Sequence, residues 1–199
     1  MIMSTFKIIA VSNWELYRKS YGTDKIEDYA NHLAKMDDSE YKPDMLILRE
    51  KKLTGTEYAK LLEVVWKKLQ SSEIMLIPHT YLSAARQLEM PKIHLPFGML
   101  KQYAKGKQLE GVELIGTSIH SPEEAIEAEQ LGASYITAGH IFATDCKPGL
   151  EPRGMNFLEK VCENVNIPVY AIGGIHPENL EKIRHSKAGG ACMMSEYMK

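Results

Sequence analysis

The sequence predicts one (β/α)8 TIM barrel domain over residues 1–199, compact for its class and with its last helix missing or truncated. Short apolar runs alternate with amphipathic segments along the whole chain, which indicates βαβ units and a parallel sheet. Eight such runs share the 199 residues without a linker or a low-complexity tract. Eight repeats in one domain favour a closed barrel, and an open flavodoxin-like sheet is the alternative.

The predicted strands are nearly continuous apolar runs, as expected for parallel strands that are covered on both faces. They are Lys7–Val11, Met45–Leu48, Ile74–Ile77, Lys92–Leu95, Val112–Gly116, Tyr135–Ala138, Val169–Ile172 and Ala191–Met194. In a barrel of parallel strands, the residues that follow each strand meet at one end, where the active site lies.

Helical patterns lie between the strands. Lys25–Met36 and Thr56–Gln70 each place apolar residues on one face. A capping-box form begins at Thr54, and an N-cap serine followed by proline begins a helix at Ser121. Further helices are indicated by Phe157, Leu158, Val161 and Val165, by Pro177, Leu180 and Ile183, and more weakly around Ala84 and Leu100.

The eighth helix is missing from the pattern, because only Tyr197-Met198-Lys199 follow the last strand and its loop. A bare side over the first and last strands would expose an apolar patch, the kind of surface that usually marks an interface. We therefore expect a homodimer, or a chain shortened relative to its full gene product. Coverage by Met1–Phe6 or by a loop over Asn13–Gly22 is a weaker alternative, because Tyr17–Ser20 is polar.

Composition limits the classes of function. The formal net charge is −2 and the basic residues are scattered, which argues against a nucleic-acid partner. The three cysteines form no C-x-x-C pair, which is typical of a reducing compartment. The N-terminus lacks the pattern of a secretory signal, and no apolar stretch is long enough to span a membrane. These features predict a cytoplasmic protein that acts on a small molecule.

Several residues with chemical potential follow the predicted strands. They are Arg49, Glu50, Lys51, His79, Thr117, Ser118, His120, His140, Gly173, Gly174, Ser195 and Glu196. Two glycines after the seventh strand suit a phosphate site, because the backbone can approach an anion closely. His140 after the sixth strand suits proton transfer near neutral pH. The histidines show no metal-ligand spacing and no carboxylate cluster accompanies them, so we expect no metal site.

Two stretches carry a family resemblance. Residues 139–154, which contain Gly-His-Ile-Phe-Ala-Thr-Asp-Cys-Lys, and residues 167–175, which end in Ala-Ile-Gly-Gly-Ile, resemble the TenI branch of the thiamine-phosphate-synthase-like barrels. Leu46–Lys51 and Gly116–Ser121 support the resemblance, which covers most of the chain in spacing and is detailed over about residues 112–195.

The resemblance implies a thiazole tautomerase, an isomerase that aromatises a thiazole carboxylate phosphate by moving one proton. The family's catalytic histidine falls on His140. The other residues implied in substrate binding are Arg49, Lys51, Thr117, His120, Thr144, Lys147, Gly173, Gly174, Met194 and Ser195. The glycines and Ser195 would hold the phosphate, and the basic residues would hold the carboxylate or stabilise developing negative charge. No cofactor is implied.

The second activity on this scaffold is thiamine phosphate synthesis, which joins a pyrimidine pyrophosphate to a thiazole phosphate with Mg²⁺. The synthase pattern supplies aspartates after the third and fourth strands. This chain has Ile77-Pro78-His79-Thr80 and Leu95-Pro96-Phe97-Gly98 there, without a carboxylate. On this ground the sequence favours the tautomerase. A catalytically silent, phosphate-binding regulatory protein is a third hypothesis, because Glu196 stands beside the expected phosphate site.

Overall fold

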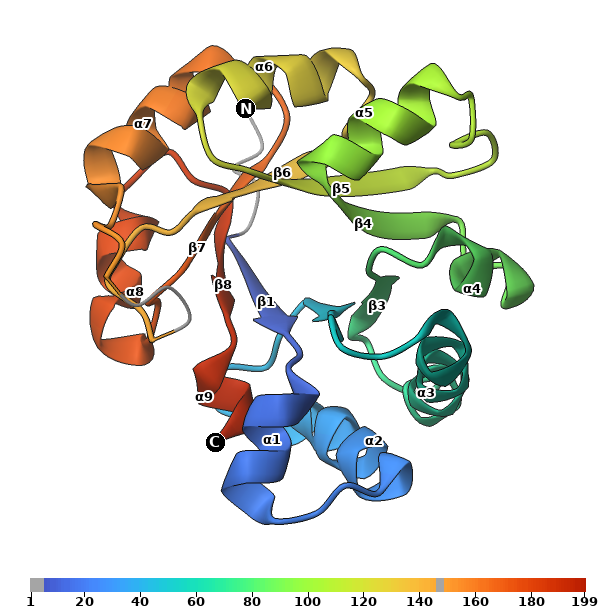
Figure 1. Ribbon diagram of the computed structural model, residues 1–199. Coiled ribbons are helices and arrows are strands. Elements are labelled where there is room, and N and C mark those ends of the chain that lie inside the picture. The colour runs from blue at the N-terminus through green and yellow to red at the C-terminus, as the bar shows by residue number, and fades with distance from the viewer. Residues whose placement is uncertain (1–5, 146–148) are drawn as a thin grey trace.

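Eight parallel strands form a nearly closed barrel in the computed structural model, which describes residues 6–145 and 149–199 (Figure 1). The strands are β1 Lys7–Val11, β2 Met45–Leu48, β3 Met75–Pro78, β4 Lys92–Pro96, β5 Leu114–Ile119, β6 Tyr135–Gly139, β7 Val169–Ile172 and β8 Gly190–Met193. Their order is β3-β2-β1-β8-β7-β6-β5-β4, and every pair is parallel. The predicted barrel is confirmed.

The barrel closes between β3 and β4 by a single parallel bridge, His79 to His94. The backbone N–H of Thr80, just after the carboxyl end of β3, donates over 2.9 Å to the carbonyl of His94 in the middle of β4. Pro78, the last residue of β3, has no N–H to add to this seam. The two histidines are therefore where the barrel is joined.

The helices surround the barrel (Figure 1). They are α1 Trp14–Tyr21, α2 Ile26–Ala34, the 3₁₀ turn Lys35–Asp38, α3 Gly55–Lys68, α4 Leu82–Gln87, α5 Phe97–Lys105, α6 Pro122–Gln130, α7 Gly154–Asn164, α8 Pro177–Arg184 and α9 Ser195–Met198. Both predicted N-termini are confirmed: Thr54 forms a capping box with Glu57, and Ser121 accepts from the Glu124 N–H over 3.1 Å. No helix among the described residues is long and apolar enough to cross a membrane.

The fifth strand lies later in the chain than predicted. It begins at Leu114 rather than Val112 and continues through Thr117 and Ser118 to Ile119. These two hydroxyl residues looked like a loop in the sequence, but they pair with Leu95 and Pro96 of β4 and with Ile136 and Thr137 of β6. Because successive side chains of a strand point to opposite faces, the side chain of Ser118 can point into the barrel.

Two apolar layers stabilise the barrel. The strand residues that point outward pack with the helices in one large core. A smaller core fills the barrel interior and consists of Ile9, Val11, Met45, Ile47, Ile77, Tyr135, Tyr170 and Cys192. The interior is thus packed, as in other barrels of this class, and the polar residues are left at its two ends.

The side over β1 and β8 is covered by two helices that the sequence did not predict. α1 occupies the region expected to be a loop, with Asn13 accepting from the Leu16 N–H at its start and Gly22 in the left-handed conformation at its end. Tyr17 is only 4% exposed and lies against the rings of Tyr21, Tyr29 and His32. The objection that this segment is too polar was therefore wrong, because one buried face is enough.

The chain end completes this cover. Tyr197 and Met198 of α9 are buried, and the Met198 sulfur accepts from the backbone N–H of Asn13 over 3.4 Å. In Figure 1, α1 and α9 lie side by side below β1 and β8. The bare face that motivated the predicted homodimer is thus covered within one chain, and the homodimer itself stays a prediction.

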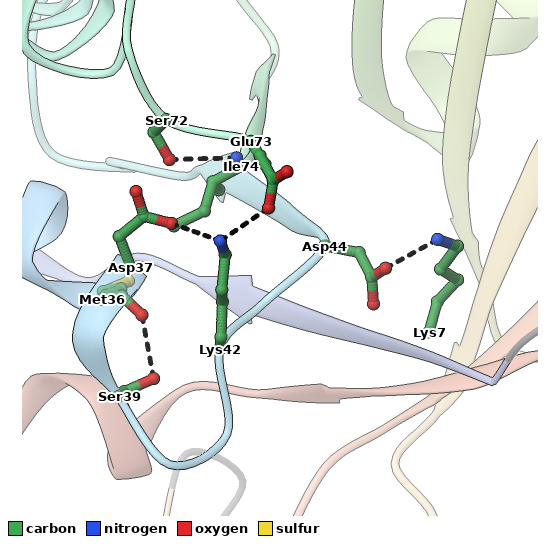
Figure 2. Close-up of polar contacts among 9 residues, drawn as sticks. All are labelled: Lys7, Met36, Asp37, Ser39, Lys42, Asp44, Ser72, Glu73 and Ile74. Atoms are coloured by element: carbon green, nitrogen blue, oxygen red, sulfur yellow. Dashed lines mark hydrogen bonds and ion pairs between the residues drawn. The ribbon is translucent and has the colours of Figure 1, made fainter.

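The amino ends of the strands carry exposed ion pairs. The Lys42 Nζ lies 2.9 Å from Asp37 Oδ1 and from Glu73 Oε2, and the Lys7 Nζ lies 2.6 Å from Asp44 Oδ1 (Figure 2). Lys42 thereby links the segments that lead into β2 and β3. Partly exposed pairs of this kind each contribute little to stability. This end of a barrel serves the fold, and chemistry belongs to the opposite end.

Candidate functional site

A layer of polar side chains lies above the apolar interior, at the carboxyl ends of the strands. Its buried members include His79 and His94, which are 7% and 2% exposed. Their rings are stacked, with centroids 5.4 Å apart and planes 15° from parallel. Because the same residues bridge β3 and β4, the stack is fixed by the closure of the barrel.

Hydrogen bonds satisfy His94 on both sides. Its Nε2 lies 2.8 Å from the Ser118 Oγ, which also accepts from the Thr137 hydroxyl over 2.8 Å. Its Nδ1 lies 3.1 Å from the Tyr135 hydroxyl. This series of hydrogen bonds runs across β4, β5 and β6. It occupies both ring nitrogens of His94, so neither is available to a ligand. His94 therefore supports the site from beneath.

His79 has one ring nitrogen engaged within its own loop, since the Thr80 Oγ1 lies 2.6 Å from its Nδ1. Burial is the main cause that lowers the pKa of His79 well below its usual range. Electrostatic coupling to His94 and the charges of Arg49 and Lys51 act in the same direction. Burial, with a smaller effect of Arg49, lowers the pKa of His94 to about 3. Both imidazoles are neutral at pH 7.

The neutral histidines make stability depend on pH. Their pKa values are lower in the folded state than the ordinary value of about 6.5, so the unfolded chain takes up protons first as the pH falls. The contribution of the two neutral histidines to the free energy of unfolding is intact above about pH 6.5 and is lost progressively as the pH falls below it. Between pH 7 and pH 5 we expect the free energy of unfolding to fall by about 2 kcal/mol through His94, and to fall further through His79.

Urea unfolding at both pH values, on wild type and His94→Gln, checks this expectation. Glutamine keeps a hydrogen-bonding side chain that does not titrate, so the variant should lose less stability between pH 7 and pH 5. Burial raises the pKa of Glu50, which acts in the opposite direction, but it does so in both proteins. Equal losses in wild type and variant would contradict the assignment.

Arg49 and Lys51 follow β2 on the same side of the mouth as His79. Arg49 is half-buried and Lys51 is exposed. Arg49 continues the alternation of Met45 and Ile47, which point into the barrel. Both cations lower the pKa of His79, so their positive charge acts on this corner of the mouth.

Glu50, between these two cations, is turned away from the mouth. Its Oε1 accepts from the Ser12 and Tyr29 hydroxyls over 2.6 and 2.7 Å, and its Oε2 accepts from the Trp14 N–H over 2.8 Å. The side chain is buried, with 6% exposure of the residue. Glu50 thus anchors the turn from β1 into α1, and it is not a ligand for the site.

His140 is also enclosed by the chain. The residue is only 5% exposed, its Nε2 lies 3.3 Å from the Leu150 carbonyl, and its buried Nδ1 has no partner among the described residues. The expectation that its ring projects at the barrel mouth does not match this burial. The cause is local, because the β6 loop folds closely over the Gly173-Gly174 turn.

The two glycines are required by that close approach. A Cβ on Gly173 would lie 2.2 Å from the His140 Cβ, and one on Gly174 would lie 2.2 Å from the Ala143 carbonyl oxygen. Both residues have positive φ, 101° and 65°. A substitution such as Gly174→Val would therefore disturb the loop itself, and it would not test phosphate binding alone.

The remaining residues predicted to bind substrate differ in their position and in whether their side chains are available to a ligand. Thr117 is fully buried and its hydroxyl donates to the Leu95 carbonyl over 2.8 Å, so it is not available to a ligand. The His120 Nδ1 lies 3.0 Å from the Gly139 carbonyl. Met194 and Ser195 lie at the end of β8 and the start of α9. Thr144 lies in the loop after β6, and Lys147 lies outside the described residues.

Sequence reasoning missed His94, Tyr135 and Thr137. The available signal was alternation: His94 stands between Ile93 and Leu95, so it points to the opposite face of β4 from two residues of the outer core. A polar side chain at such a position in a parallel strand needs a partner inside the barrel. The sequence could indicate this need, but not that Ser118 and Tyr135 supply the partners.

The side chains do not suit Mg²⁺, which prefers carboxylate and other oxygen ligands. The ends of β3 and β4 carry His79-Thr80 and Phe97-Gly98, and the three hydrogen bonds of Glu50 hold it elsewhere. Within residues 6–145 and 149–199, no three His, Cys, Asp or Glu side chains gather as a metal site would need. A magnesium-dependent step is therefore not assigned to these residues.

The fold and its mouth define the class of protein, a (β/α)8 barrel with polar side chains above its apolar interior. The family model described as thiamine monophosphate synthase matches residues 23–197, and the chain belongs to this family. A thiamine-phosphate synthase from Syntrophomonas wolfei is 32% identical over 155 residues, 77% of this chain and 74% of that protein. A putative thiamine-phosphate synthase 2 from Aquifex aeolicus is 33% identical over 181 residues, 91% of this chain and 94% of that protein.

The fold is also similar to that of a solved structure. A solved structure described as thiamine phosphate pyrophosphorylase from Pyrococcus furiosus aligns with a TM-score of 0.77 and 22% identity, covering all of this chain and 90% of that one. At this identity the likeness shows the fold alone. It supports the eight-stranded barrel over the open sheet that the sequence left as an alternative.

The interpretation as a thiazole tautomerase was wrong. The relatives that cover most of the chain are named thiamine-phosphate synthase, and none of those compared above is named a tautomerase. The error lay in using two missing aspartates to exclude the transfer reaction. Missing carboxylates bear on how a metal ion would be held, whereas phosphate binding and ring positioning depend on other groups. The enclosed His140 also gives no support to a proton carrier at the mouth.

Proposed function

We propose that this protein is a transferase of the thiamine-phosphate synthase type, which joins a pyrimidine pyrophosphate to a thiazole phosphate. The observation that carries the proposal is the match at 32% identity, over 77% of the chain, to a relative named thiamine-phosphate synthase. In the reaction, the bond between the pyrimidine methylene carbon and the pyrophosphate oxygen breaks. A bond forms from that carbon to the thiazole nitrogen, and pyrophosphate leaves with the electron pair.

The mouth offers groups for both substrates. Arg49 and Lys51 would neutralise the leaving pyrophosphate. Gly173, Gly174, Met194 and Ser195 would hold the thiazole phosphate through the backbone, as expected for the loops after the last two strands of a barrel. His120, directly after β5, and Thr144, in the loop after β6, remain candidates to contact the rings. We further propose a cytoplasmic enzyme without a nucleic-acid partner.

The test is direct synthesis. The purified chain is incubated with pyrimidine pyrophosphate and thiazole phosphate, with and without Mg²⁺, and thiamine phosphate is measured by chromatography after oxidation to its fluorescent derivative. We expect product in proportion to enzyme and time. Absence of product, with thiazole phosphate still bound in a titration, would contradict the proposal and favour the silent regulatory protein instead.

A further inference from the structure

The corner of the mouth formed by β2, β3 and β4 carries positive and neutral side chains, and it lacks the carboxylates after β3 and β4 that would hold a magnesium ion beside pyrophosphate. Arg49 and Lys51 bring two positive charges to the end of β2. His79, at the end of β3, is neutral at pH 7 because burial lowers its pKa. The end of β4 contributes Phe97 and Gly98. The ends of β3 and β4 thus contribute neutral groups and no carboxylate to this corner, and the end of β2 contributes two cations beside Glu50.

The carboxylate nearest in sequence does not change this balance. Glu50 lies between the two cations, but Ser12, Trp14 and Tyr29 hold both of its oxygens. Turning it toward the mouth would leave three donors unsatisfied in the protein interior, at about 1–3 kcal/mol for each. The anchoring of Glu50 therefore keeps negative charge out of the corner.

A magnesium ion at this corner would have no anionic protein ligand from β3 or β4 to hold it. Pyrophosphate still needs positive charge, and guanidinium and ammonium groups supply it directly. Arg also offers a rigid fork of donors that matches phosphate oxygens. The stack with His94 fixes the ring of His79, with 5.4 Å between the two ring centroids. Arg49 and Lys51 act on this ring through their charge, since both lower the pKa of His79.

We propose that pyrophosphate binds and leaves at this corner without a divalent metal ion. Arg49 and Lys51 balance its charge, and the neutral His79 ring provides a hydrogen bond where the synthase pattern has a metal-binding aspartate. The assignment of pyrophosphate as the leaving group rests on the proposed function. The binding of inorganic pyrophosphate does not, so the two can be tested separately.

The test measures inorganic pyrophosphate binding to the full chain by calorimetry, in excess EDTA and in excess Mg²⁺. We expect dissociation constants that agree within about tenfold, a difference below 1.4 kcal/mol. Binding that is more than about tenfold tighter with Mg²⁺, or binding only with Mg²⁺, would overturn the proposal. So would the absence of binding under both conditions.

A matched pair of variants tests the role of position 79. His79→Asp and His79→Asn differ in charge and little in shape, and circular dichroism verifies that each is folded. In EDTA, the aspartate variant should bind pyrophosphate at least about tenfold more weakly than the asparagine variant, and Mg²⁺ should restore its binding. Equal affinities in EDTA would show that position 79 does not face the anion and would overturn its part in the proposal.

Turnover in the same two buffers separates this inference from the proposed function. Thiamine phosphate formed in EDTA supports both. Pyrophosphate binding in EDTA without product in either buffer contradicts the proposed function and leaves the metal-free anion site in place. Product that appears only with Mg²⁺ supports the transferase and overturns the metal-free corner.

Discussion

Replacing Arg49 with glutamine is expected to lower kcat/KM for thiamine phosphate formation by about 10²–10³-fold, the usual effect of removing one group that stabilises developing charge. The charge of Arg49 acts at the mouth, since it contributes to lowering the pKa of both His79 and His94. The hydrogen bond from Arg49 to the Ser12 Oγ uses the backbone N–H and is kept in the variant. Circular dichroism verifies that the variant is folded. Steady-state kinetics with both substrates measures the effect.

Lys60→Gln is the matched control, because Lys60 is an exposed cation on α3. It removes the same charge from the chain without touching the mouth, so its kcat/KM should stay within about threefold of wild type, as usual for surface substitutions. If Arg49→Gln also stays within this range, the leaving group is not held by Arg49. If both variants lose activity together, net charge and not position is responsible.

Replacing Glu50 with alanine is expected to lower the free energy of unfolding by about 3–5 kcal/mol, because it leaves the donors of Ser12, Trp14 and Tyr29 without an acceptor. Two of these three donors, Ser12 and Trp14, belong to the turn from β1 to α1, so this turn loses most of the stabilisation. Urea unfolding followed by circular dichroism measures it. Few single substitutions reach this size without a buried network.

Two further variants decide the cause. Glu50→Gln keeps the shape and one acceptor, so it should cost less than alanine. Glu113→Ala removes an exposed carboxylate of the same type and should change stability by no more than about 0.5 kcal/mol. A loss below about 1 kcal/mol for Glu50→Ala would show that water replaces the carboxylate and that the network does not anchor α1.

Residues that follow strands were predictable, and their roles were not. Arg49, Glu50 and Lys51 are consecutive in sequence, so position alone made them equal candidates. The structure separates them, because the partners of Glu50 lie 21 to 38 residues away in the chain. Whether a polar side chain binds substrate or supports the fold depends on such distant partners.

The sequence by itself predicted the barrel and the start of α6 at Ser121, and it indicated a capping box at Thr54 without excluding a nearby start of α3. Alternating apolar runs and caps are local signals, since each depends on neighbours within a few residues. The glycine pair after β7 is likewise a local signal. The sequence indicated that the backbone there needs glycine, and the structure showed that the β6 loop is the reason.

Only the tertiary structure decided how the barrel is covered and how its mouth is built. α1 and α9 have eight and four residues, too few for an apolar period to indicate a helix, and they are held by packing between the two chain ends. The stack of His79 and His94 joins strands that are neighbours only because the barrel closes. Contacts between distant segments carry no local pattern, so their geometry arises when the chain folds.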